Sequence, residues 1–315
     1  MIINMTKRFY IALALLVAAP ALVFAQQTQS PLTITVKGVS FKMIRVQGGT
    51  FTMGATSEQG SDAYDWEKPA HKVTLSTYYI GETEVTQELW KAVMGSNPSE
   101  FKPKETDAAR CSYDAFVADV QRLNAKKPGS MHVPTRQEWD AAMVTTSGSL
   151  KRPVENVSWE DCQEFIRRLN ELTGKKFRLP TEAEWEFAAR GGTKSAGYKY
   201  SGSNDINTVA WYTVNAYDKG KSSPDYGTHV VKTKKPNELG IYDMSGNVYE
   251  WCSDWYGDYT DAAQTNPKGA SSGSSRVYRG GGWYSDAWNC RSSYRDAITP
   301  DSRLICLGLR LVLVP

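Results

Sequence analysis

The most informative segment of this 315-residue chain is Gly240-Ile241-Tyr242-Asp243-Met244-Ser245-Gly246-Asn247-Val248-Tyr249-Glu250-Trp251. Glycine and asparagine in its middle favour a tight turn, and a carboxylate stands on either side. A hard cation such as calcium binds about six to eight oxygens, drawn from carboxylates and main-chain carbonyls. A turn flanked by Asp243 and Glu250 is suited to supply both kinds. The alternative is a plain turn, in which Asp243 caps the chain and Glu250 pairs with an arginine.

A second segment, Arg279-Gly280-Gly281-Gly282-Trp283, leads to a cysteine that is a candidate reactive group. Cys290 is followed directly by Arg291, and Arg295 lies a helical turn further on. A neighbouring arginine lowers the pKa of a thiol and makes it reactive. The interpretation that we favour is instead a disulfide, most plausibly from Cys290 to Cys252, because oxidation is the usual fate of paired thiols in an oxidising compartment.

The N-terminus has the features of an export signal. Lys7 and Arg8 precede an apolar run from Phe9 to Phe24, and Ala25 provides a small residue at the cut site. A secretory signal peptide over residues 1–25 is therefore expected, with an uncleaved anchor as the alternative. We expect an exported chain, in the periplasm or at the cell surface, with no transmembrane segment after cleavage.

Charge and motif content exclude several functional classes. The formal net charge falls from +3 to +1 once Lys7 and Arg8 are removed, so nothing favours a nucleic-acid partner. The three histidines, His71, His132 and His229, have no ligand-like spacing. We find no nucleophile turn, phosphate-binding glycine loop or dinucleotide fingerprint.

After a flexible lead-in over residues 26–40, the first half of the chain predicts one domain built from short strands and a helix. Strand patterns occur at Lys42–Val46, Thr50–Met53, Lys72–Leu75 and Tyr78–Gly81. Thr86 is a predicted N-cap for a helix over residues 87–94, which Gly95 ends.

An internal duplication follows. Residues 111–143 match residues 157–189 without gaps, and each copy predicts a helix, a short strand and a second helix. Ser112 and Ser158 are predicted caps for the first helices. Thr135 with Glu138, and Thr181 with Glu184, have the spacing of capping boxes for the second. Residues 194–239 then predict irregular loops anchored by Trp211 and Tyr212, and strands return at residues 276–279 and 307–314.

Taken together, these segments resemble the formylglycine-generating enzyme family, also called the sulfatase-modifying factors. The resemblance covers roughly residues 41–315, and its fold would be a loop-rich α+β domain related to C-type lectins. The segments that carry it are Gly48–Gly54, Glu84-Val85-Thr86, Pro153–Trp159, Phe177–Glu186, Gly240–Trp251, Arg279–Trp283, Thr299–Ser302 and Leu307–Arg310.

The resemblance implies a calcium ion and weighs against copper. The family's calcium site falls on the side chains of Asp243 and Glu250 and the carbonyls of Gly246 and Val248. A second family site, near residues 207–211, has no clear counterpart. The enzymes bind copper(I) through two cysteines, a soft pair that this metal selects. Those two positions fall here on Ser285 and Cys290, so one thiolate is missing.

We therefore expect an exported domain of this fold that acts as a binding or assembly module, with a protein of the cell envelope or a glycan as partner. The loops at residues 194–226 and 254–275 are the expected contact surfaces. The alternative is an oxidase, which generates formylglycine or modifies another substrate through Cys290.

Overall fold

A computed structural model describes residues 31–102, 113–126, 132–133, 135 and 149–314. The signal peptide predicted over residues 1–25 lies outside this range. So do Ser112, Glu138 and the second helix of the first repeat copy. Within the described range no helix is both long and apolar enough to cross a bilayer.

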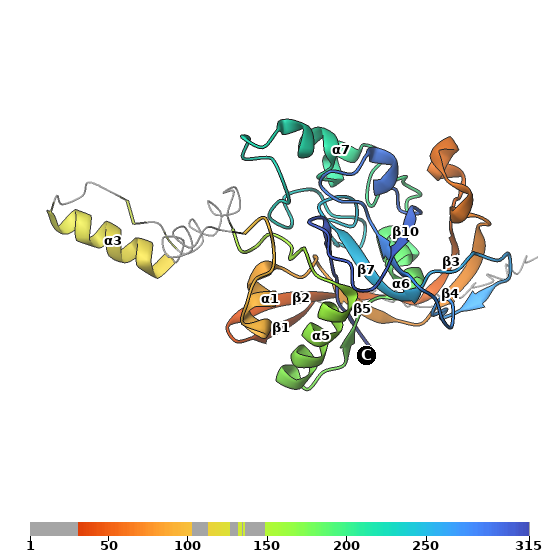
Figure 1. Cartoon of the computed structure of the whole chain (residues 1–315), viewed down its shortest axis with the longest axis horizontal. Helices are drawn as coiled ribbons and strands as arrows, with labels where there is room; N and C mark the ends of the chain where they lie inside the picture. Colours follow the sequence, from red (N-terminus) through yellow and green to blue (C-terminus); the bar gives the residue numbers. More distant parts are fainter. Residues whose placement is uncertain (1–30, 103–112, 127–131, 134, 136–148, 315) are drawn as a thin grey trace, which may run out of the picture. The chain divides into compact units, whose positions relative to one another are not determined.

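A five-stranded antiparallel sheet contains both the first and the last strand of the domain, in the order β1-β2-β5-β12-β6. Its strands are β1 (Leu32–Val36), β2 (Val39–Val46), β5 (Tyr78–Gly81), β12 (Val312–Leu313) and β6 (Phe177–Arg178). The C-terminal β12 lies between β5 and β6, and Figure 1 marks the C-terminus close to β5. The flexible lead-in was wrong from Leu32 onward, because Ile34 and Val36 alternate with exposed residues and are buried in β1.

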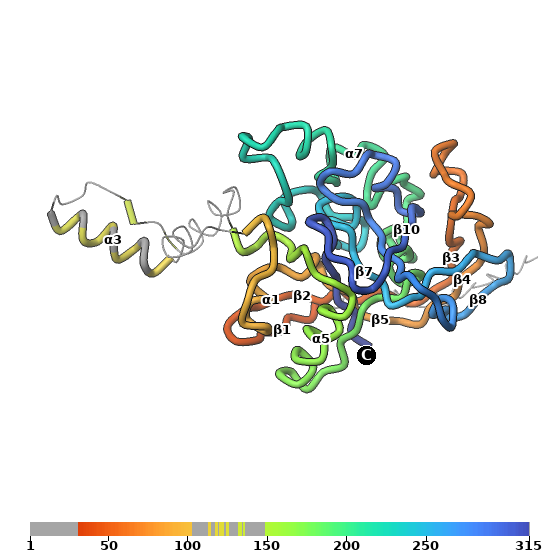
Figure 2. The backbone as a smooth tube through the Cα atoms, viewed as in Figure 1, coloured from red at the N-terminus to blue at the C-terminus, as the bar shows by residue number. Residues whose placement is uncertain are grey.

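Two smaller sheets complete the strands. A four-stranded sheet has the order β10-β9-β7-β11, from β10 (Arg295–Ile298), β9 (Arg276–Arg279), β7 (Tyr249–Trp255) and β11 (Leu307–Gly308). A three-stranded sheet joins β3 (Gly49–Met53), β4 (His71–Leu75) and β8 (Gln264–Thr265). The single strand predicted at residues 307–314 is two strands, β11 and β12, in different sheets. Figure 2 shows the short strands and the long irregular segments between them.

Local capping explains the helices. In α1 (Gln87–Met94) the Thr86 hydroxyl accepts a hydrogen bond from Leu89 N, and Gly95 ends the helix with φ 86°. Ser158 and Thr181 complete capping boxes with Asp161 and Glu184 at the starts of α5 (Trp159–Thr173) and α6 (Glu182–Ala189). The predicted caps at Thr86, Ser158 and Thr181 are therefore confirmed. The other described helices are α3 (Tyr113–Lys126), α7 (Ile206–Val209) and the 3-10 turns η1 (Ser57–Asp62), η2 (Asp65–Glu67), η3 (Gly192–Lys194), η4 (Thr213–Asn215), η5 (Tyr217–Lys219) and η6 (Ala287–Cys290).

The core of this loop-rich α+β fold contains buried charges as well as apolar side chains. All eight residues of α6 are buried, including three glutamates. Glu182 pairs with Arg295 at 2.7 Å and Glu184 with Arg178 at 2.7 Å, while Glu186 pairs with Arg190 and Arg279. A buried charge is tolerated when it is paired and hydrogen-bonded. Arg178 and Arg190 lie just before and just after α6, whereas Arg279 and Arg295 come from β9 and β10, which are distant in sequence.

Candidate functional site

The turn at residues 243–247 is held in a conformation that only a few residue types adopt readily. Asp243, Gly246 and Asn247 have φ values of 58°, 79° and 65°. Left-handed backbone is most accessible to glycine, asparagine and aspartate. At Gly246 a Cβ would lie 2.9 Å from Trp211 N and 3.0 Å from the Ala210 side chain. The tight turn predicted from the sequence is therefore present, and position 246 has no space for any side chain.

Glu250 lies on β7 directly after this turn, and its carboxylate is fully engaged. Arg310 Nε lies 3.0 Å from Oε1 and 2.9 Å from Oε2, and Arg310 Nη2 donates to Oε1 at 2.6 Å. Trp185 Nε1 donates to Oε2 at 2.7 Å. Glu250 therefore pairs with an arginine, as the alternative for this turn expected, while the calcium site itself stays a prediction. Both Glu250 and Arg310 are buried, so this pair occupies the oxygens that a cation at Glu250 would use.

Asp243 is buried beside this pair but keeps more of its bonding capacity. Its Oδ2 accepts a hydrogen bond from Lys232 N at 2.8 Å. Burial raises the pKa of Asp243 to about 6, and the bond from Lys232 N partly offsets that rise. Asp243 is therefore the one predicted calcium ligand whose side chain is not tied to a cation.

The structure adds a buried carboxylate, that of Glu84, for which the sequence analysis predicted no role. Glu84, between β5 and α1, is 2% exposed. Neither of its oxygens has a hydrogen-bond partner in the described part of the chain. Burial raises the pKa of Glu84 well above its ordinary value, and the negative charges of Asp243 and Glu250 add to the rise. The signal available in the sequence was its place in Glu84-Val85-Thr86.

The oxygens present therefore fit a calcium ion only in part. Asp243 and Glu84 offer carboxylate oxygens, whereas those of Glu250 are taken. Gly246 and Val248 lie in the turn as expected and offer only main-chain carbonyls. The described residues contain no group of three or more His, Cys, Asp or Glu side chains able to hold a metal ion.

Cys290 lies at the end of η6, against the glycine segment. A Cβ placed on Gly281 would lie 2.5 Å from Cys290 Sγ, which explains why glycine occupies that position. The next residue, Gly282, donates its N–H to Ser285 Oγ at 2.9 Å. Cys290 and Ser285 are both buried. The two family positions therefore flank the Gly281-Gly282 peptide, one with sulfur and one with a hydroxyl.

The environment of Cys290 does not activate it. Burial raises the pKa of its thiol to about 12, and Asp286 adds to this rise. The arginines expected to lower it point elsewhere, because Arg291 Nη2 pairs with Glu67 at 2.6 Å and Arg295 with Glu182. The expectation that these arginines activate Cys290 was wrong, because buried glutamates bind both side chains.

The predicted disulfide between Cys252 and Cys290 was also wrong. Both thiols are free, as are those of Cys162 and Cys306. Cys252 lies on β7 in a core with residues of β3, β4 and α6, whereas Cys290 packs with Tyr200, Tyr212 and Ala210. The two cysteines therefore belong to different hydrophobic clusters.

Two histidines are placed well enough to describe as single groups. His71 is buried, with Nδ1 3.0 Å from the carbonyl oxygen of Pro69. His229 stacks on Trp211 with ring centroids 3.6 Å apart. Burial lowers the pKa of His229 to about 3, so its ring is neutral at physiological pH. These contacts describe histidines that serve packing and hydrogen bonding.

Five exposed apolar side chains surround the Ser285 loop, and we call this set the rim. Thr213 N donates to Ser285 O at 3.0 Å, which brings η4 to the loop, and Trp283 Nε1 donates to Ile305 O at 3.0 Å. The rings of Tyr217 and Tyr284 lie 6.4 Å apart. The rim consists of Val214, Tyr217, Tyr284, Trp288 and Ile305, which are 37–55% exposed. The predicted loop 194–226 contributes to it. The loop 254–275 has no large exposed hydrophobic residue among the described residues.

Comparisons with known proteins agree with this geometry. Residues 33–314 match the family described as the sulfatase-modifying factor enzyme 1-like domain. A "Chaperone protein LppX" of Paenibacillus barcinonensis is 35% identical over 314 residues, which cover 95% of this chain and 96% of that protein. The "Formylglycine-generating enzyme" of Streptomyces coelicolor is 33% identical over 289 residues, which cover 85% of this chain and 87% of that protein.

Among solved structures, "Treponema denticola variable protein 1" has a TM-score of 0.67 at 34% identity, covering 91% of this chain and 99% of that one. Similarity of this extent, along nearly the whole length, agrees with the family resemblance drawn from the turn and the glycine segment. The chain belongs to the sulfatase-modifying factor enzyme 1-like domain family and has the fold of the formylglycine-generating enzymes.

Proposed function

We propose that this chain is an exported binding or assembly module of the family that lacks copper-dependent cysteine oxidation. The observation that carries the proposal is at the Gly281-Gly282 segment, where Cys290 lies against Gly281 but the hydroxyl of Ser285, and not a second thiol, accepts the bond from Gly282 N. Copper(I) selects soft thiolates. A hydroxyl is a hard ligand, and a buried thiol with a pKa near 12 stays protonated at neutral pH.

The rim supplies the surface for such a role. Its five apolar side chains gather around one loop, and contiguous exposed apolar surface is typical of interaction sites. Tyr217, Tyr284 and Trp288 offer aromatic faces, which suit both protein partners and sugars. The similarity to a protein named a chaperone favours a protein of the cell envelope as the partner. A calcium ion near Asp243 is part of the proposal as a structural cofactor.

The chemical half of the proposal is tested with copper(I), air and a cysteine-containing peptide. We expect no aldehyde from the wild-type protein, and no tight stoichiometric copper(I) binding. Ser285→Cys restores a thiol at the second position of the family pair and should increase copper(I) affinity by two orders of magnitude or more, since it supplies a second soft ligand.

Ser292→Cys is the matched control. Ser292 is fully buried, its hydroxyl has no partner within the described range, and it lies two residues from Cys290. A thiol there adds a cysteine without restoring the family pair, so copper(I) affinity should stay at the wild-type level. Aldehyde formation by the wild-type protein would overturn the proposal in favour of the oxidase.

The proposed role as a binding module is tested by substitutions in the rim. Wild-type protein is applied to a glycan array, and its ability to suppress aggregation of a denatured exported enzyme is measured in parallel. A variant with Tyr217, Tyr284 and Trp288 changed to serine should lose the activity that the wild type shows. Suppression favours a protein partner and sugar retention favours a glycan. If neither activity depends on these three side chains, the rim is not the binding surface.

A further inference from the structure

The starting observation is an exposed tryptophan at a cavity that the rim does not include. Trp66, in η2, is 44% exposed. It lines a cavity of about 470 Å³ together with Tyr256, Arg295, Asp296 and residues 273–275. Ligand sites are typically concave, with an apolar or aromatic surface and a few polar groups that orient the ligand. This cavity has both kinds of group, so the chemistry of its lining indicates what it can bind.

Neighbouring side chains hold the indole of Trp66 in place. Its ring stacks on Tyr64, with the centroids 4.3 Å apart and 7° between the planes, and Tyr64 meets Tyr294 edge-on at 6.0 Å. Tyr64 N donates to Glu67 Oε1 at 3.0 Å, and Arg291 binds the same carboxylate. Tyr64 therefore covers one face of the indole, and the opposite face and the edges account for its exposure. An aromatic surface that is already ordered loses little entropy when a ligand binds.

Asp296 supplies hydrogen-bond acceptors in the same cavity. Its Oδ1 accepts a bond from Ala297 N at 2.7 Å, and its Oδ2 accepts one from the Tyr294 hydroxyl at 3.2 Å. An ionised carboxylate can accept about four bonds, so about two acceptor positions are left for a ligand. Bonds to an ionised acceptor are roughly twice as strong as those between neutral groups. A ligand with several hydroxyl donors suits this side chain.

Arg295 lines the cavity but does not make it a site for anions. Its Nε and Nη2 bind the two oxygens of Glu182 at 2.7 Å and 2.8 Å, and its Nη1 donates to Gly257 O at 2.9 Å. Glu182 therefore compensates the charge of the guanidinium. The carboxylate of Asp296 repels a second negative charge. A phosphorylated or carboxylated ligand is disfavoured for both reasons.

The aromatic rings of the cavity do not form a cage for an organic cation. Quaternary ammonium ligands bind between several open aromatic faces. The guanidinium of Arg295 already lies over the ring of Tyr256, 4.5 Å from its centroid, and Tyr64 covers one face of Trp66. The cavity therefore offers one flat aromatic surface with acceptors nearby, and a neutral ligand fits it better than an ion.

We propose that this cavity binds a neutral saccharide, which stacks an apolar ring face on Trp66 and donates hydroxyl bonds to Asp296. A pyranose ring has a face of C–H groups and an edge of hydroxyls. The negative face of an aromatic ring attracts the C–H groups, and the hydroxyls of Ser274 and Ser275 can act as donors or acceptors for the edge. The inference goes beyond the proposed function, since the cavity and the rim have no residue in common.

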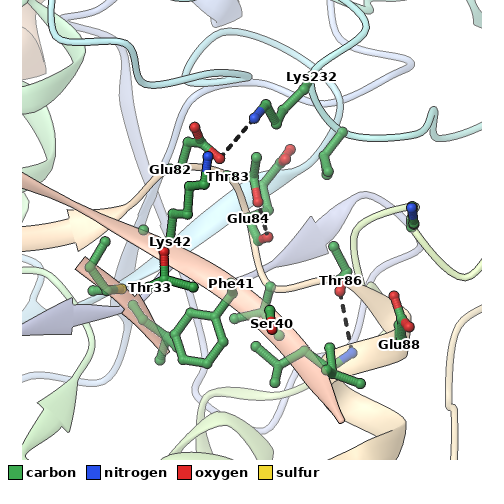
Figure 3. Close-up of a pocket in the computed structure, with 18 of the residues that line it drawn as sticks. Thr33, Ser40, Phe41, Lys42, Glu82, Thr83, Glu84, Thr86, Glu88 and Lys232 are labelled. Carbon is green, nitrogen blue, oxygen red and sulfur yellow. Dashed lines mark hydrogen bonds and ion pairs between the residues drawn. The ribbon is translucent and has the colours of Figure 1, made fainter. Parts of the chain in front are cut away.

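A second cavity, drawn in Figure 3, lacks this combination. It has a volume of about 390 Å³, and Lys232 reaches across it to Glu82 at 2.9 Å. Phe41 is the one aromatic residue among the described residues that line it, and this half-buried ring packs on Phe177 with centroids 5.9 Å apart. A neutral sugar would find an ion pair and no open aromatic face there. The cavity at Trp66 is therefore the better site for a saccharide.

Saccharide binding is measured on an array of neutral hexose and N-acetylhexosamine oligosaccharides, and then by calorimetry with the oligosaccharide that is retained best. We expect the wild type to retain at least one of them. Trp66→Ala should weaken binding about tenfold or more, because truncation of a central tryptophan removes a large share of the binding free energy. Trp66→Phe keeps a smaller aromatic ring and should bind with an affinity between those of Trp66→Ala and the wild type. This variant gives an answer if Trp66→Ala does not fold.

Asp296→Asn tests the polar half of the site. The substitution keeps one acceptor oxygen and removes the charge, so binding should weaken severalfold and less than in Trp66→Ala. Tyr198→Ala is the matched control. Tyr198 is an exposed aromatic residue, at 37%, that belongs neither to this cavity nor to the rim. Its removal should leave saccharide affinity at the wild-type value.

The array separates the failure of this inference from that of the proposed function. If the wild type retains no neutral oligosaccharide, or if Trp66→Ala binds it as tightly as the wild type, the saccharide site is wrong. If retention is lost on changing Tyr217, Tyr284 and Trp288 but not Trp66, sugar binds at the rim and the proposed surface stands. Displacement of the oligosaccharide by choline would show a cation site instead. Loss of the rim's activity has no bearing on Trp66, whose effect on saccharide affinity is measured separately.

Discussion

The region around the Gly281-Gly282 peptide and the region around the start of β7 bury polar groups in different ways. Around the Gly281-Gly282 peptide the structure keeps them neutral, with the Cys290 thiol protonated and its arginine neighbours directed away. Around β7 it keeps an ion pair, in which Arg310 holds Glu250, while burial raises the pKa of the nearby Asp243 and Glu84. The first region is an apolar core beneath an exposed rim, and the second is a buried cluster of acidic side chains with one paired arginine.

The difference teaches that one fold can bury polar groups in two ways. Below the rim the buried thiol of Cys290 has a raised pKa and no partner of opposite charge. At β7 the buried carboxylate of Glu250 is paired with Arg310, as buried charges in proteins generally are. Neutral groups below the rim and charged groups below β7 should therefore respond in opposite ways to substitution.

Removal of Arg310 should have the largest effect on stability. Arg310→Met leaves Glu250 buried and unpaired, which should lower the free energy of unfolding by about 3–5 kcal/mol. Urea unfolding in the presence of a chelator measures the loss. Added calcium should restore part of it, because the variant holds one more uncompensated negative charge.

Arg303→Met is the control for this variant. Arg303 pairs with Asp161 at 2.8 Å, but the two side chains are 50% and 33% exposed, so its loss should cost no more than about 1 kcal/mol. If Arg303→Met and Arg310→Met lower the free energy of unfolding equally, the buried pair contributes no more to stability than the exposed pair. The contrast between the two regions would then disappear.

Glu155 tests whether the region beneath the rim is kept neutral. Its Oε1 accepts a bond from Phe101 N at 2.9 Å, its Oε2 has no partner among the described residues, and Phe101 packs on Trp283. Burial raises the pKa of Glu155 to about 8. The folded state therefore keeps a proton that the unfolded state releases near its ordinary pKa, and stability falls as pH rises from about 4.5 to 8.

Glu155→Gln should remove this part of the pH dependence. The free energy of unfolding of the variant should exceed that of the wild type by on the order of a few kcal/mol at pH 8 and by little at pH 4. Urea unfolding across this pH range measures the difference. Burial also raises the pKa of Asp254 to about 7. The free energy of unfolding should therefore still fall with rising pH below pH 7 in both proteins. A difference between variant and wild type that does not change with pH would show that Glu155 is ionised in the native state.

Local signals in the sequence predicted much of the fold. Thr86, Ser158 and Thr181 cap helices through bonds within four residues, so spacing alone identifies them. The turn at residues 243–247 was likewise predictable, because its left-handed backbone needs glycine and asparagine at set places. The family resemblance then supplied the overall fold from an ordered series of such segments.

The site depended on contacts that no local pattern reveals. Arg310 lies 60 positions beyond Glu250 and reaches it only when the C-terminal segment packs beside β5 and β7. The disulfide prediction failed for the same reason, since Cys252 and Cys290 are drawn into different clusters by the strands and loops that carry them. Arg291 was expected to face Cys290 beside it, but its partner is Glu67, 224 positions away.

Substitution of an exposed rim residue should have the smallest effect on stability. Such a variant therefore tests binding without disturbing the fold. Trp288 is 42% exposed, so Trp288→Ser should change the free energy of unfolding by no more than about 0.5 kcal/mol. Trp283 lies beneath the rim and is 1% exposed, so Trp283→Ala should cost about 3–5 kcal/mol. Urea unfolding of both variants gives the comparison. A loss above about 2 kcal/mol for Trp288→Ser would mean that this aromatic ring supports the fold, and its exposure would no longer argue for a partner.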